Sequence, residues 1–598
     1  MNELVLTACR PDPIGSYLKS LGILRLVSEQ ADSRARGRWS PAGVFVLSTQ
    51  LDLDQLESFF LDDYRPTPLV APWNSGSGFR VGGKSPDAER SLKAIEESSL
   101  PRLETFRRAI AIGRTIVEQG ERLDWGDSKG KEFWSKQGKQ QVLRLCRALL
   151  PDEAIAWLDA CVVLTASEKY SPLLGGSGGV FGRMELSVNY MKRLVDVFAL
   201  GEGRRAPTRA HSEAWLRATL LDNRPARLLA EPAGQFDPGE TSIEAVNPWT
   251  YVLTLEGTLL FVSATARRLG SASEGWATLP FMVSATPTGY GTSAADESGK
   301  GELWAPLWER PAGLAEIARM IAEGRADWRG RQARDGLDFL EAAASLGVDR
   351  GIASFQRHVF VERNGQSLLA VPAGRFPVRQ IPQAGLLADV DAWMDRVRRA
   401  PKPPAAVRVG ISRTEAAVFD LVRSGSQDAA QRLQNVLAEL ALLELAIGRS
   451  PKFRDDHHLP PIGRFKAGEW LAEIDDGSPE MRLAAACAAA HDDDGRCLRW
   501  LLRPIGPVDT RGPDKLRGAR PEWTESPAIV PGLANGHLVD VMARALVRRA
   551  IEPGGNLLFS SDTPPVEQSD GPGRLAFSRQ PVQADVTDLA RFVADRLD

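Results

Sequence analysis

The chain is poor in cysteine. Its 598 residues contain five, which are Cys9, Cys146, Cys161, Cys487 and Cys497. An odd number of scattered cysteines, with no C-x-x-C pair among them, argues against a disulfide framework and against a zinc ribbon. The pattern favours a protein of the reducing cytoplasm, and we expect it to need neither a metal ion nor another cofactor.

The chain also lacks a net charge of either sign and a long apolar run. Its 74 lysines and arginines are balanced by 77 aspartates and glutamates, so contact with nucleic acid must come from local basic patches. The apolar run at the N-terminus is too short for a signal peptide. Residues 248–266 carry Glu256 as their single charge. Because glycine, threonines and this acid lower the hydropathy, a buried core helix is favoured over a membrane span.

Length and punctuation by glycine and proline predict an α+β fold in three domains. The stretch Gly201–Thr208 is rich in glycine, arginine and proline, and prolines recur at 401, 403 and 404. We expect an N-terminal α+β domain with glycine loops at 1–205 and a middle α+β domain with a hairpin at 206–404. A C-terminal α-helical bundle is expected at 405–598.

Apolar periodicity predicts the main elements. We expect helices at 17–30, 53–61, 188–198, 212–221, 248–269, 538–551 and after Asp585, a strand at 44–48 and a loop at 503–520. Ser16 is expected to cap the first helix, and Asn247 with Pro248 to begin the helix that ends before Gly270. In the bundle, one apolar stripe ending at Gly448 comprises Leu433, Val436, Leu437, Leu440, Leu443 and Ile447.

Phe355–Val371 predicts a β-hairpin, because two alternating runs are joined through Asn364 and Gly365. A period of two places Arg357 and Arg363 on one strand face. Two guanidiniums in that arrangement suit contact with phosphates or base edges, and Asn364 lies beside them. The alternative is that both arginines pair with neighbouring acids.

Two segments combine glycine with small polar residues. The first lies between Trp73 and Phe79 and comprises Asn74, Ser75, Gly76, Ser77 and Gly78; the second comprises Gly175, Gly176, Ser177, Gly178 and Gly179. Glycine permits positive φ and lets a polyanion approach the backbone N–H groups, so the two segments are interpreted as one binding site. The second is not a Walker loop, because it lacks the Gly-Lys-Ser/Thr ending. Ordinary surface turns are the alternative.

Basic residues surround the second segment. The candidates for nucleic-acid contact are Lys169, Arg183, Lys192 and Arg193. A further basic stretch, Arg102–Arg147, has Trp125, Phe133 and Trp134 interleaved, a mixture that suits a phosphate backbone and stacked bases. A helical hairpin with solvated charges is the alternative there.

Two clusters hold residue types that bind metals, at 455–458 (DDHH) and 491–494 (HDDD). Phosphohydrolase sites of this kind need further histidines, and the chain has six in total. Loops or helix ends are therefore the favoured interpretation of both clusters.

Four segments together resemble a known family. They are IGSYLKSLGILRLVSEQ (14–30), YRPTPLVAPWNSGSGF (64–79), YSPLLGGSGG (170–179) and SFQRHVFVERNGQSLLAVPAGRF (354–376). In this combination they resemble the large subunit of the type I-G (formerly I-U) CRISPR Cascade surveillance complex, from the N-terminus to about Phe376. The sequence departs from the expected pattern at Val180 and Phe181, where an asparagine or glycine would follow the glycines.

The resemblance implies a non-catalytic subunit of an RNA-guided antiviral complex. Its expected partners are CRISPR RNA, target double-stranded DNA, the repeated backbone subunits, the RNA-end-binding subunit and the helicase-nuclease that it docks. Such a subunit inspects the motif flanking the protospacer and supports R-loop formation, while base pairing reads the target sequence. A metal- or nucleotide-dependent nucleic-acid hydrolase, using Gly175–Gly179 or His491, is the competing hypothesis. A scaffold that contacts protein alone is a third.

Overall fold

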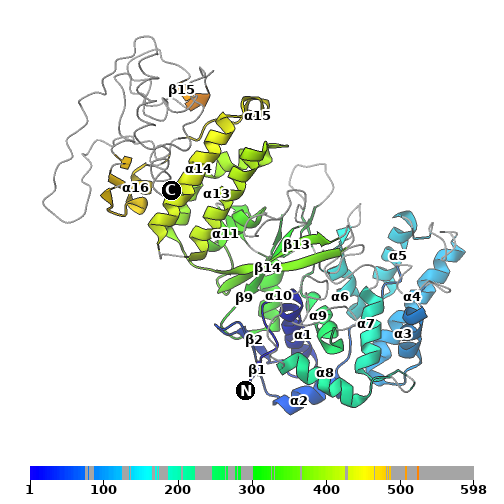
Figure 1. Ribbon diagram of the computed structural model, residues 1–598. Coiled ribbons are helices and arrows are strands. Elements are labelled where there is room, and N and C mark those ends of the chain that lie inside the picture. Colours follow the sequence, from blue (N-terminus) through cyan, green and yellow to red (C-terminus); the bar gives the residue numbers. More distant parts are fainter. Residues whose placement is uncertain are drawn as a thin grey trace, which may run out of the picture. The chain divides into compact units, whose positions relative to one another are not determined.

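The protein has an α+β fold of antiparallel sheets and many helices, as expected (Figure 1). Its structure is a computed structural model. The residues described are 1–73, 86–123, 136–163, 186–201, 206–221, 246–262, 301–324, 330–363, 367–424, 428–463 and 467–479, with short stretches between and after them. Residues 1–286 and 292–378 form one compact unit (unit 1), and residues 287–291 and 379–598 form another (unit 2).

The N-terminal sheet of unit 1 is built from distant parts of the sequence. Its order is β1 (Asn2–Leu6), β3 (Phe45–Thr49), β2 (Arg36–Trp39) and β10 (Ala312–Gly313), all antiparallel. The indole of Trp308 donates a hydrogen bond to the Gly37 carbonyl at 2.7 Å, beside the short strand β10. The middle of the chain therefore completes a sheet that the N-terminus begins.

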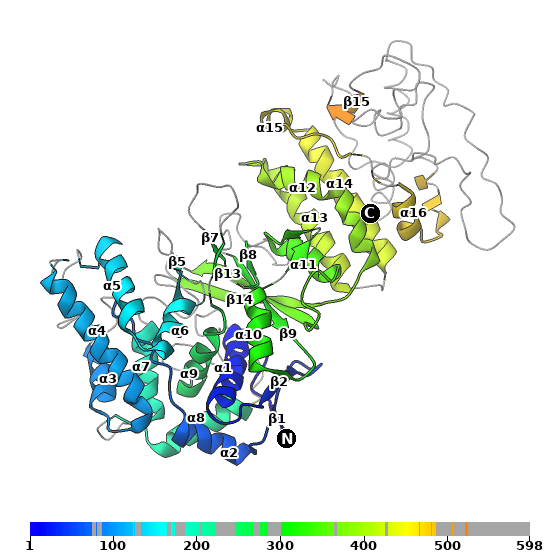
Figure 2. The same ribbon diagram turned by 180° about the vertical axis from the view of Figure 1, so that it is seen from behind.

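The helix pair α1 (Ile14–Gln30) and α9 (Pro248–Thr258) forms the centre of unit 1 (Figure 2). Most of α1 and all of α9 are buried, and Glu256 is the single charged residue of α9. Gly22 and Gly257 lie at the crossing. A Cβ on Gly22 would stand 2.1 Å from the Leu253 carbonyl oxygen, and one on Gly257 would stand 1.8 Å from that of Leu18. Glycine is thus required for the helices to approach this closely.

Two predictions about these helices need correction. Asn247 does cap α9, accepting hydrogen bonds from the N–H groups of Trp249 and Thr250, but the helix ends at Thr258 and not near Leu269. The predicted extension contains β6 (Ala264–Ala266) instead. Ser16 lies inside α1, where its hydroxyl accepts from Arg10 N and donates to the Ala8 carbonyl. The apolar pattern continues across both boundaries, so periodicity alone misplaced them.

The second sheet of unit 1 has the order β14 (Ser367–Pro377), β13 (Ser354–Arg363), β9 (Glu302–Leu307) and β8 (Met282–Val283). It confirms the predicted hairpin, with Arg363 opposite Ser367 and a register shift between Gln356 and His358. Helix α11 (Gly336–Ala344) packs its Phe339 ring on Trp304 of this sheet at 4.7 Å. Strand β9 and the described part of β13 are buried along most of their length, whereas the edge strands β14 and β8 are mostly half-buried.

The remaining elements of unit 1 are mostly helices. They are α2 (Leu53–Ser58) with a π-helical turn (Phe59–Asp63), α3 (Pro86–Glu97), a 3-10 turn (Pro101–Leu103), α4 (Glu104–Arg122), α5 (Lys136–Leu149), α6 (Asp152–Cys161), β4 (Val162–Val163), β5 (Lys169–Tyr170), α7 (Leu186–Val197), α8 (Arg209–Leu221), β7 (Trp276–Thr278), α10 (Leu314–Glu323), β11 (Asp327–Trp328) and β12 (Arg331–Gln332). The predicted helices at 53–61, 188–198 and 212–221 correspond to α2, α7 and α8.

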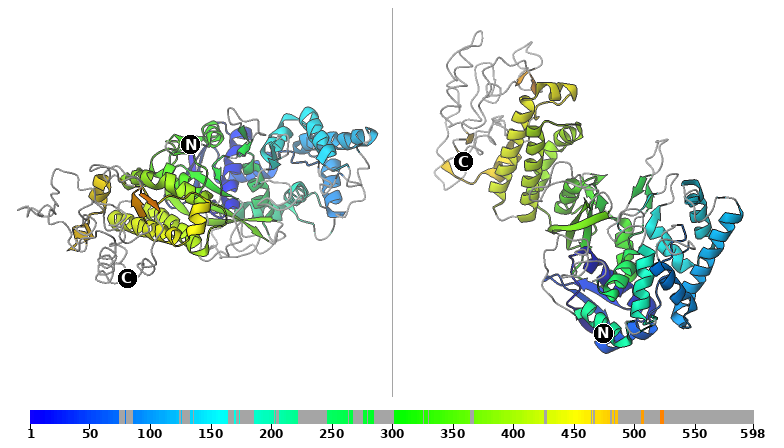
Figure 3. Two further views of the ribbon diagram at one scale, coloured as in Figure 1. Left: turned by 90° about the horizontal axis from the view of Figure 1, so that it is seen from above. Right: turned by 45° about the vertical axis from the view of Figure 1, so that its right-hand side comes forward.

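Unit 2 contains a 3-10 turn (Pro382–Leu387), α12 (Ala388–Arg399), α13 (Ala405–Ser424), α14 (Ala429–Gly448), α15 (Pro451–Asp456) and α16 (Ala467–Ile474). Helices α13 and α14 lie side by side (Figure 3). The predicted apolar stripe of α14 is confirmed, since all six of its side chains are fully buried. The short strands β15 (Ile505–Pro507) and β16 (Pro521–Trp523) pair, so the predicted loop at 503–520 begins with a strand. The helices expected at 538–551 and after Asp585 lie outside the described residues.

The three-domain division stays a prediction. The expected boundary at 205 falls between α7 and α8, inside unit 1, and the boundary at 404 falls between α12 and α13, inside unit 2. The two units divide between Val378 and Arg379.

Candidate functional site

The two residues flanking the first glycine segment are both anchored in the core. Trp73 and Phe79 are buried, on either side of residues 74–78. The ring of Phe79 lies on Gly113 of α4, where a Cβ would come within 2.7 Å of it and within 3.3 Å of Pro72. The residues just before and just after the first glycine segment therefore both lie beside Gly113 of α4.

The second glycine segment is approached from the same part of the protein. Trp157 of α6 packs against Trp73, with ring centroids 4.8 Å apart. After α6 the chain forms the antiparallel pair β4–β5, with Val163 opposite Lys169, and the glycines at 175–179 follow. Aromatic packing thus joins the described residues that precede each of the two segments.

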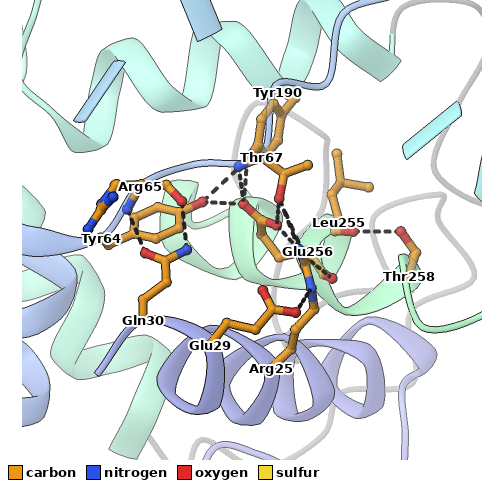
Figure 4. Close-up of polar contacts among 10 residues, drawn as sticks. All are labelled: Arg25, Glu29, Gln30, Tyr64, Arg65, Thr67, Tyr190, Leu255, Glu256 and Thr258. Carbon is orange, nitrogen blue, oxygen red and sulfur yellow. Dashed lines mark hydrogen bonds and ion pairs between the residues drawn. The ribbon is translucent and has the colours of Figure 1, made fainter. Parts of the chain in front are cut away.

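A buried carboxylate connects the same regions (Figure 4). Five groups from the described part of the chain donate to Glu256 of α9. Oε1 accepts from the Tyr64 hydroxyl at 2.6 Å, the Tyr190 hydroxyl at 2.8 Å and the Thr67 N–H at 2.9 Å. Oε2 accepts from the Thr67 hydroxyl at 2.6 Å and from the Arg25 guanidinium at 2.8 Å. We call these five residues the Glu256 cluster.

Burial governs the electrostatics of the Glu256 cluster. It raises the pKa of both Tyr64 and Tyr190 well above 10, and the negative Glu256 raises both further. Burial alone would lower the pKa of Arg25, but the carboxylates of Glu256 and Glu29 outweigh it and raise that pKa. The tyrosines therefore remain neutral donors, the arginine remains charged, and the carboxylate has its charge compensated in a dry site.

The Glu256 cluster fixes both flanks of the candidate site. Thr67 belongs to the proline-rich segment that runs to Trp73, and Tyr190 belongs to α7, the helix after the second glycine segment. Tyr190 also stacks on Phe106 of α4 at 6.3 Å. The sequence contained one signal for this arrangement, the lone acid in an apolar helix, which needs polar partners when buried. It did not identify the partners.

Most residues of the predicted site lie outside the described part of the chain. Outside the described residues lie Asn74, Ser75, Gly76, Ser77, Gly78, Gly175, Gly176, Ser177, Gly178, Gly179, Arg183 and Asn364. Lys169 lies in β5 and Arg363 ends β13, but their side chains are also outside the described part. Lys192 is half-buried on α7 and stays a candidate.

The predicted contact of Arg357 with nucleic acid is wrong, and Arg193 is mostly engaged within the fold. Arg357 is fully buried and its guanidinium donates to Glu302 at 2.6 and 2.9 Å, which is the ion pair considered as the alternative. Arg193 is buried on α7 and pairs with Asp196 at 3.2 Å. Arg357 therefore has no exposed surface for a phosphate, and 10% of the Arg193 side chain is exposed.

Several arginines of the basic stretch Arg102–Arg147 make contacts within the protein, while Arg108, Arg122 and Arg144 are exposed. Arg102 donates to the Leu61 carbonyl at 2.6 Å and lies over the Phe198 ring at 4.0 Å. Other internal pairings are Arg107 with the carbonyls of Ser98 and Leu100, Arg114 with Glu96, and Arg147 with Asp159. Phe133 is fully buried against Gly120, so it is not a platform for bases.

The described residues contain no group of three or more His, Cys, Asp or Glu side chains placed to hold a metal ion. In the first cluster considered, Asp455 pairs with Arg454 at 3.1 Å and the ring of His457 packs on Phe453 at 5.0 Å. The second cluster, His491–Asp494, lies outside the described residues.

Comparison with known proteins gives no match to a family model and none to a curated protein. Among the helices that the structure describes, none is both long and apolar enough to cross a membrane.

Proposed function

We propose that the chain is the non-catalytic large subunit of an RNA-guided CRISPR effector complex of type I-G. It recognises the protospacer-flanking motif in duplex DNA, supports R-loop formation and docks the helicase-nuclease. Its partners are CRISPR RNA, the target duplex, the backbone subunits and the RNA-end-binding subunit, in the cytoplasm. The resemblance of residues 1–376 to that family is the origin of the proposal.

One structural observation supports it. The described flanks of the two glycine segments are joined by the Trp73–Trp157 contact and by the Glu256 cluster. A reader of a short duplex motif needs a rigid support, because recognition is lost when its contacting groups are displaced by about 1 Å. Glycine backbone also suits a minor groove about 6 Å wide, where most side chains are excluded. This arrangement favours motif inspection by the two segments.

The experiment compares effector complexes assembled with the normal chain and with Gly176→Val/Gly178→Val. On duplex targets that differ only in the flanking motif, the variant complex should lose binding. It should still assemble on guide RNA and bind a target that is already single-stranded. The matched control is Gly385→Ala, at a position where a Cβ meets no atom within 4 Å.

Three results would contradict the proposal. If the variant discriminates flanking motifs normally, the inspecting element lies elsewhere, and Arg108 and Arg144, both exposed, are then the next candidates. If the variant fails to assemble, the glycines serve folding. Magnesium- or manganese-dependent cleavage by the pure chain, abolished in His491→Ala, would establish the competing hydrolase.

A further inference from the structure

In unit 2, exposed basic residues are concentrated on helices α12 and α13. Within 379–423, which covers α12 and all of α13 but its last residue, every exposed charged residue is basic. These residues are Arg379, Arg396, Arg399, Lys402, Arg408, Arg413 and Arg423. We call them the α12–α13 basic surface.

The acids of the same segment are engaged internally. Glu415, with 7% of its side chain exposed, pairs with Arg398 at 3.0 Å. Asp389 accepts a hydrogen bond from the Trp470 indole at 3.0 Å, and Asp395 pairs with Arg399 at 3.3 Å. These contacts lie within unit 2, and of the exposed cations they offset Arg399. Asp420 offsets the exposed Arg423 in the same way, at 2.9 Å.

The neighbouring segment carries exposed charges of both signs. Among its described residues within 428–479, the exposed charged ones are Asp428, Asp455, Asp456, Glu469 and Asp476, with Arg449 and Lys452. Charge of one sign is thus concentrated on α12 and α13 although the whole chain is close to neutral. A local excess of this kind is the electrostatic footprint expected of a polyanion-binding surface.

Three of the cations are especially suited to bind a partner. Arg396, Lys402 and Arg408 are exposed and form no ion pair with any residue that the structure describes. Arg413 is exposed as well, but it interacts with Glu439. Burial raises the pKa of Glu439, and the charge of Arg413 offsets part of that rise. Arg399 and Arg423 each form an ion pair with an acid of their own helix, Asp395 and Asp420 respectively.

The α12–α13 basic surface has few large apolar side chains, which favours a nucleic-acid backbone over a protein as its partner. Around Arg408 the exposed neighbours on α13 are small, and Val409, 51% exposed, is the large apolar exception. Among the described residues of the exposed class in 379–423, none is aromatic. Protein interfaces depend on buried aromatic anchors, whereas contacts with phosphates need only cations and small polar groups.

We propose that the α12–α13 basic surface binds the phosphodiester backbone of nucleic acid without regard to base sequence. The inference rests on the proposed function, and it adds a contact on unit 2 that is separate from the two glycine segments on unit 1. It assigns unit 2 to holding nucleic acid and leaves motif inspection to unit 1.

The test reverses the three unpaired cations in the full-length chain, as Arg396→Glu/Lys402→Glu/Arg408→Glu. The matched control, Arg449→Glu/Lys452→Glu/Arg482→Glu, makes the same change in net charge at exposed positions of the following segment. Binding to random-sequence single-stranded DNA and to random-sequence duplex is measured over a series of salt concentrations. Loss of three phosphate contacts should flatten the plot of log K against log salt by about 2 to 3 units, and the control should leave it unchanged.

The outcomes separate the possibilities. A flatter plot with single strands alone, with duplex alone or with both supports the proposal and identifies the form bound. An unchanged plot with both single strands and duplex overturns the proposal. If the plot is unchanged but the variant no longer binds another subunit, the proposal is overturned as well, and the partner is an acidic protein. If the reversal variant is unfolded by circular dichroism, the corresponding alanine variant is measured under the same criteria.

The same variants distinguish this inference from the proposed function. The reversal variant, placed in the assembled complex, should bind all duplex targets more weakly but keep its ratio of affinities for correct and incorrect flanking motifs. Loss of that ratio in Gly176→Val/Gly178→Val concerns the proposed function alone.

Discussion

At the scale of single residues, Glu256 is a buried carboxylate whose desolvation is unfavourable and whose hydrogen bonds require a particular set of donors. Burying a carboxylate beside one arginine is roughly neutral for stability, because desolvation cancels much of the attraction. Here the hydroxyls of Tyr64, Tyr190 and Thr67 and one backbone N–H supply the remaining contacts. The carboxylate is satisfied only when every one of these donors is in place. The Glu256 cluster therefore fixes the chain segments that carry the donors.

Replacing the carboxylate should therefore destabilise unit 1 strongly. In Glu256→Gln the amide N–H₂ faces donors and Arg25 loses its buried counter-charge, so we expect a loss of about 3 to 5 kcal/mol. Denaturant unfolding followed by tryptophan fluorescence measures it. Glu29→Gln, which removes the half-exposed partner of the same arginine, should cost less than about 1 kcal/mol. Equal costs in the two variants would show that the Glu256 cluster has no special weight.

His358 is a second buried polar residue with a measurable consequence. Its Nε2 lies 3.2 Å from the Pro11 carbonyl oxygen, and its Nδ1 is buried with no hydrogen-bond partner among the described residues. Burial lowers the pKa of this imidazole to about 4. The folded protein therefore holds it neutral at a pH where the unfolded chain, with an ordinary pKa near 6.5, binds a proton.

The sign of the pH dependence follows from that difference. Because the unfolded chain gains the proton first, stability falls as pH drops from about 6.5 toward 4, by about 1.4 kcal/mol per unit. Between pH 7 and pH 5 the normal chain should lose about 2 kcal/mol more than His358→Gln, which has nothing to protonate. Unfolding of both chains across this range measures the difference. Parallel curves would mean that His358 is solvated or charged in the folded state.

At the scale of elements, local patterns were informative and long-range pairings were not. The apolar stripe of α14 and the β13–β14 hairpin could be predicted because their signals lie within one segment. The pairing of β10 with β2 and the partners of Glu256 join residues far apart in the sequence, which no local pattern records. Arg357 was misassigned for the same reason: Glu302 lies on the neighbouring strand β9, and the alternation along β13 does not show which face is covered.

The crossing of α1 and α9 predicts a sharp sensitivity at two glycines. Gly257→Ala places a methyl group 1.8 Å from the Leu18 carbonyl oxygen, and the helix backbone cannot move aside without losing the packing of both helices. We expect a loss of at least about 3 kcal/mol, at the upper end of overpacking costs. Gly313→Ala in the same unit, where a Cβ meets only the Glu316 carboxylate at 3.7 Å, should be close to neutral. Thermal unfolding of both variants measures this, and a stable Gly257→Ala would mean that the helices are farther apart.

At the scale of the whole molecule, the two units have separate apolar cores. Unit 1 is organised around α1, α9 and two sheets, the first of which combines strands before residue 50 with β10 after residue 300. Unit 2 is organised around α13 and α14, and the buried stripe of α14 was visible in the sequence. The division between Val378 and Arg379 falls directly after the hairpin, with Pro377 and Pro382 on either side. The denser prolines at 401, 403 and 404 favoured a later boundary in the sequence, and the contacts in three dimensions place the division earlier.

Separate cores predict that the units unfold in separate steps. Leu253 in α9 and Leu440 in α14 are both fully buried, and each truncation to alanine should cost its own unit about 2 to 5 kcal/mol through lost packing and a cavity. Calorimetry of the full-length chain should therefore show two transitions, with Leu253→Ala lowering the midpoint of one and Leu440→Ala lowering the midpoint of the other. If each substitution moves both transitions equally, or a single transition is seen, the two cores are energetically one. The same experiment on Glu256→Gln assigns the unit 1 transition independently, because that substitution lies in α9 and leaves the core of α13 and α14 intact.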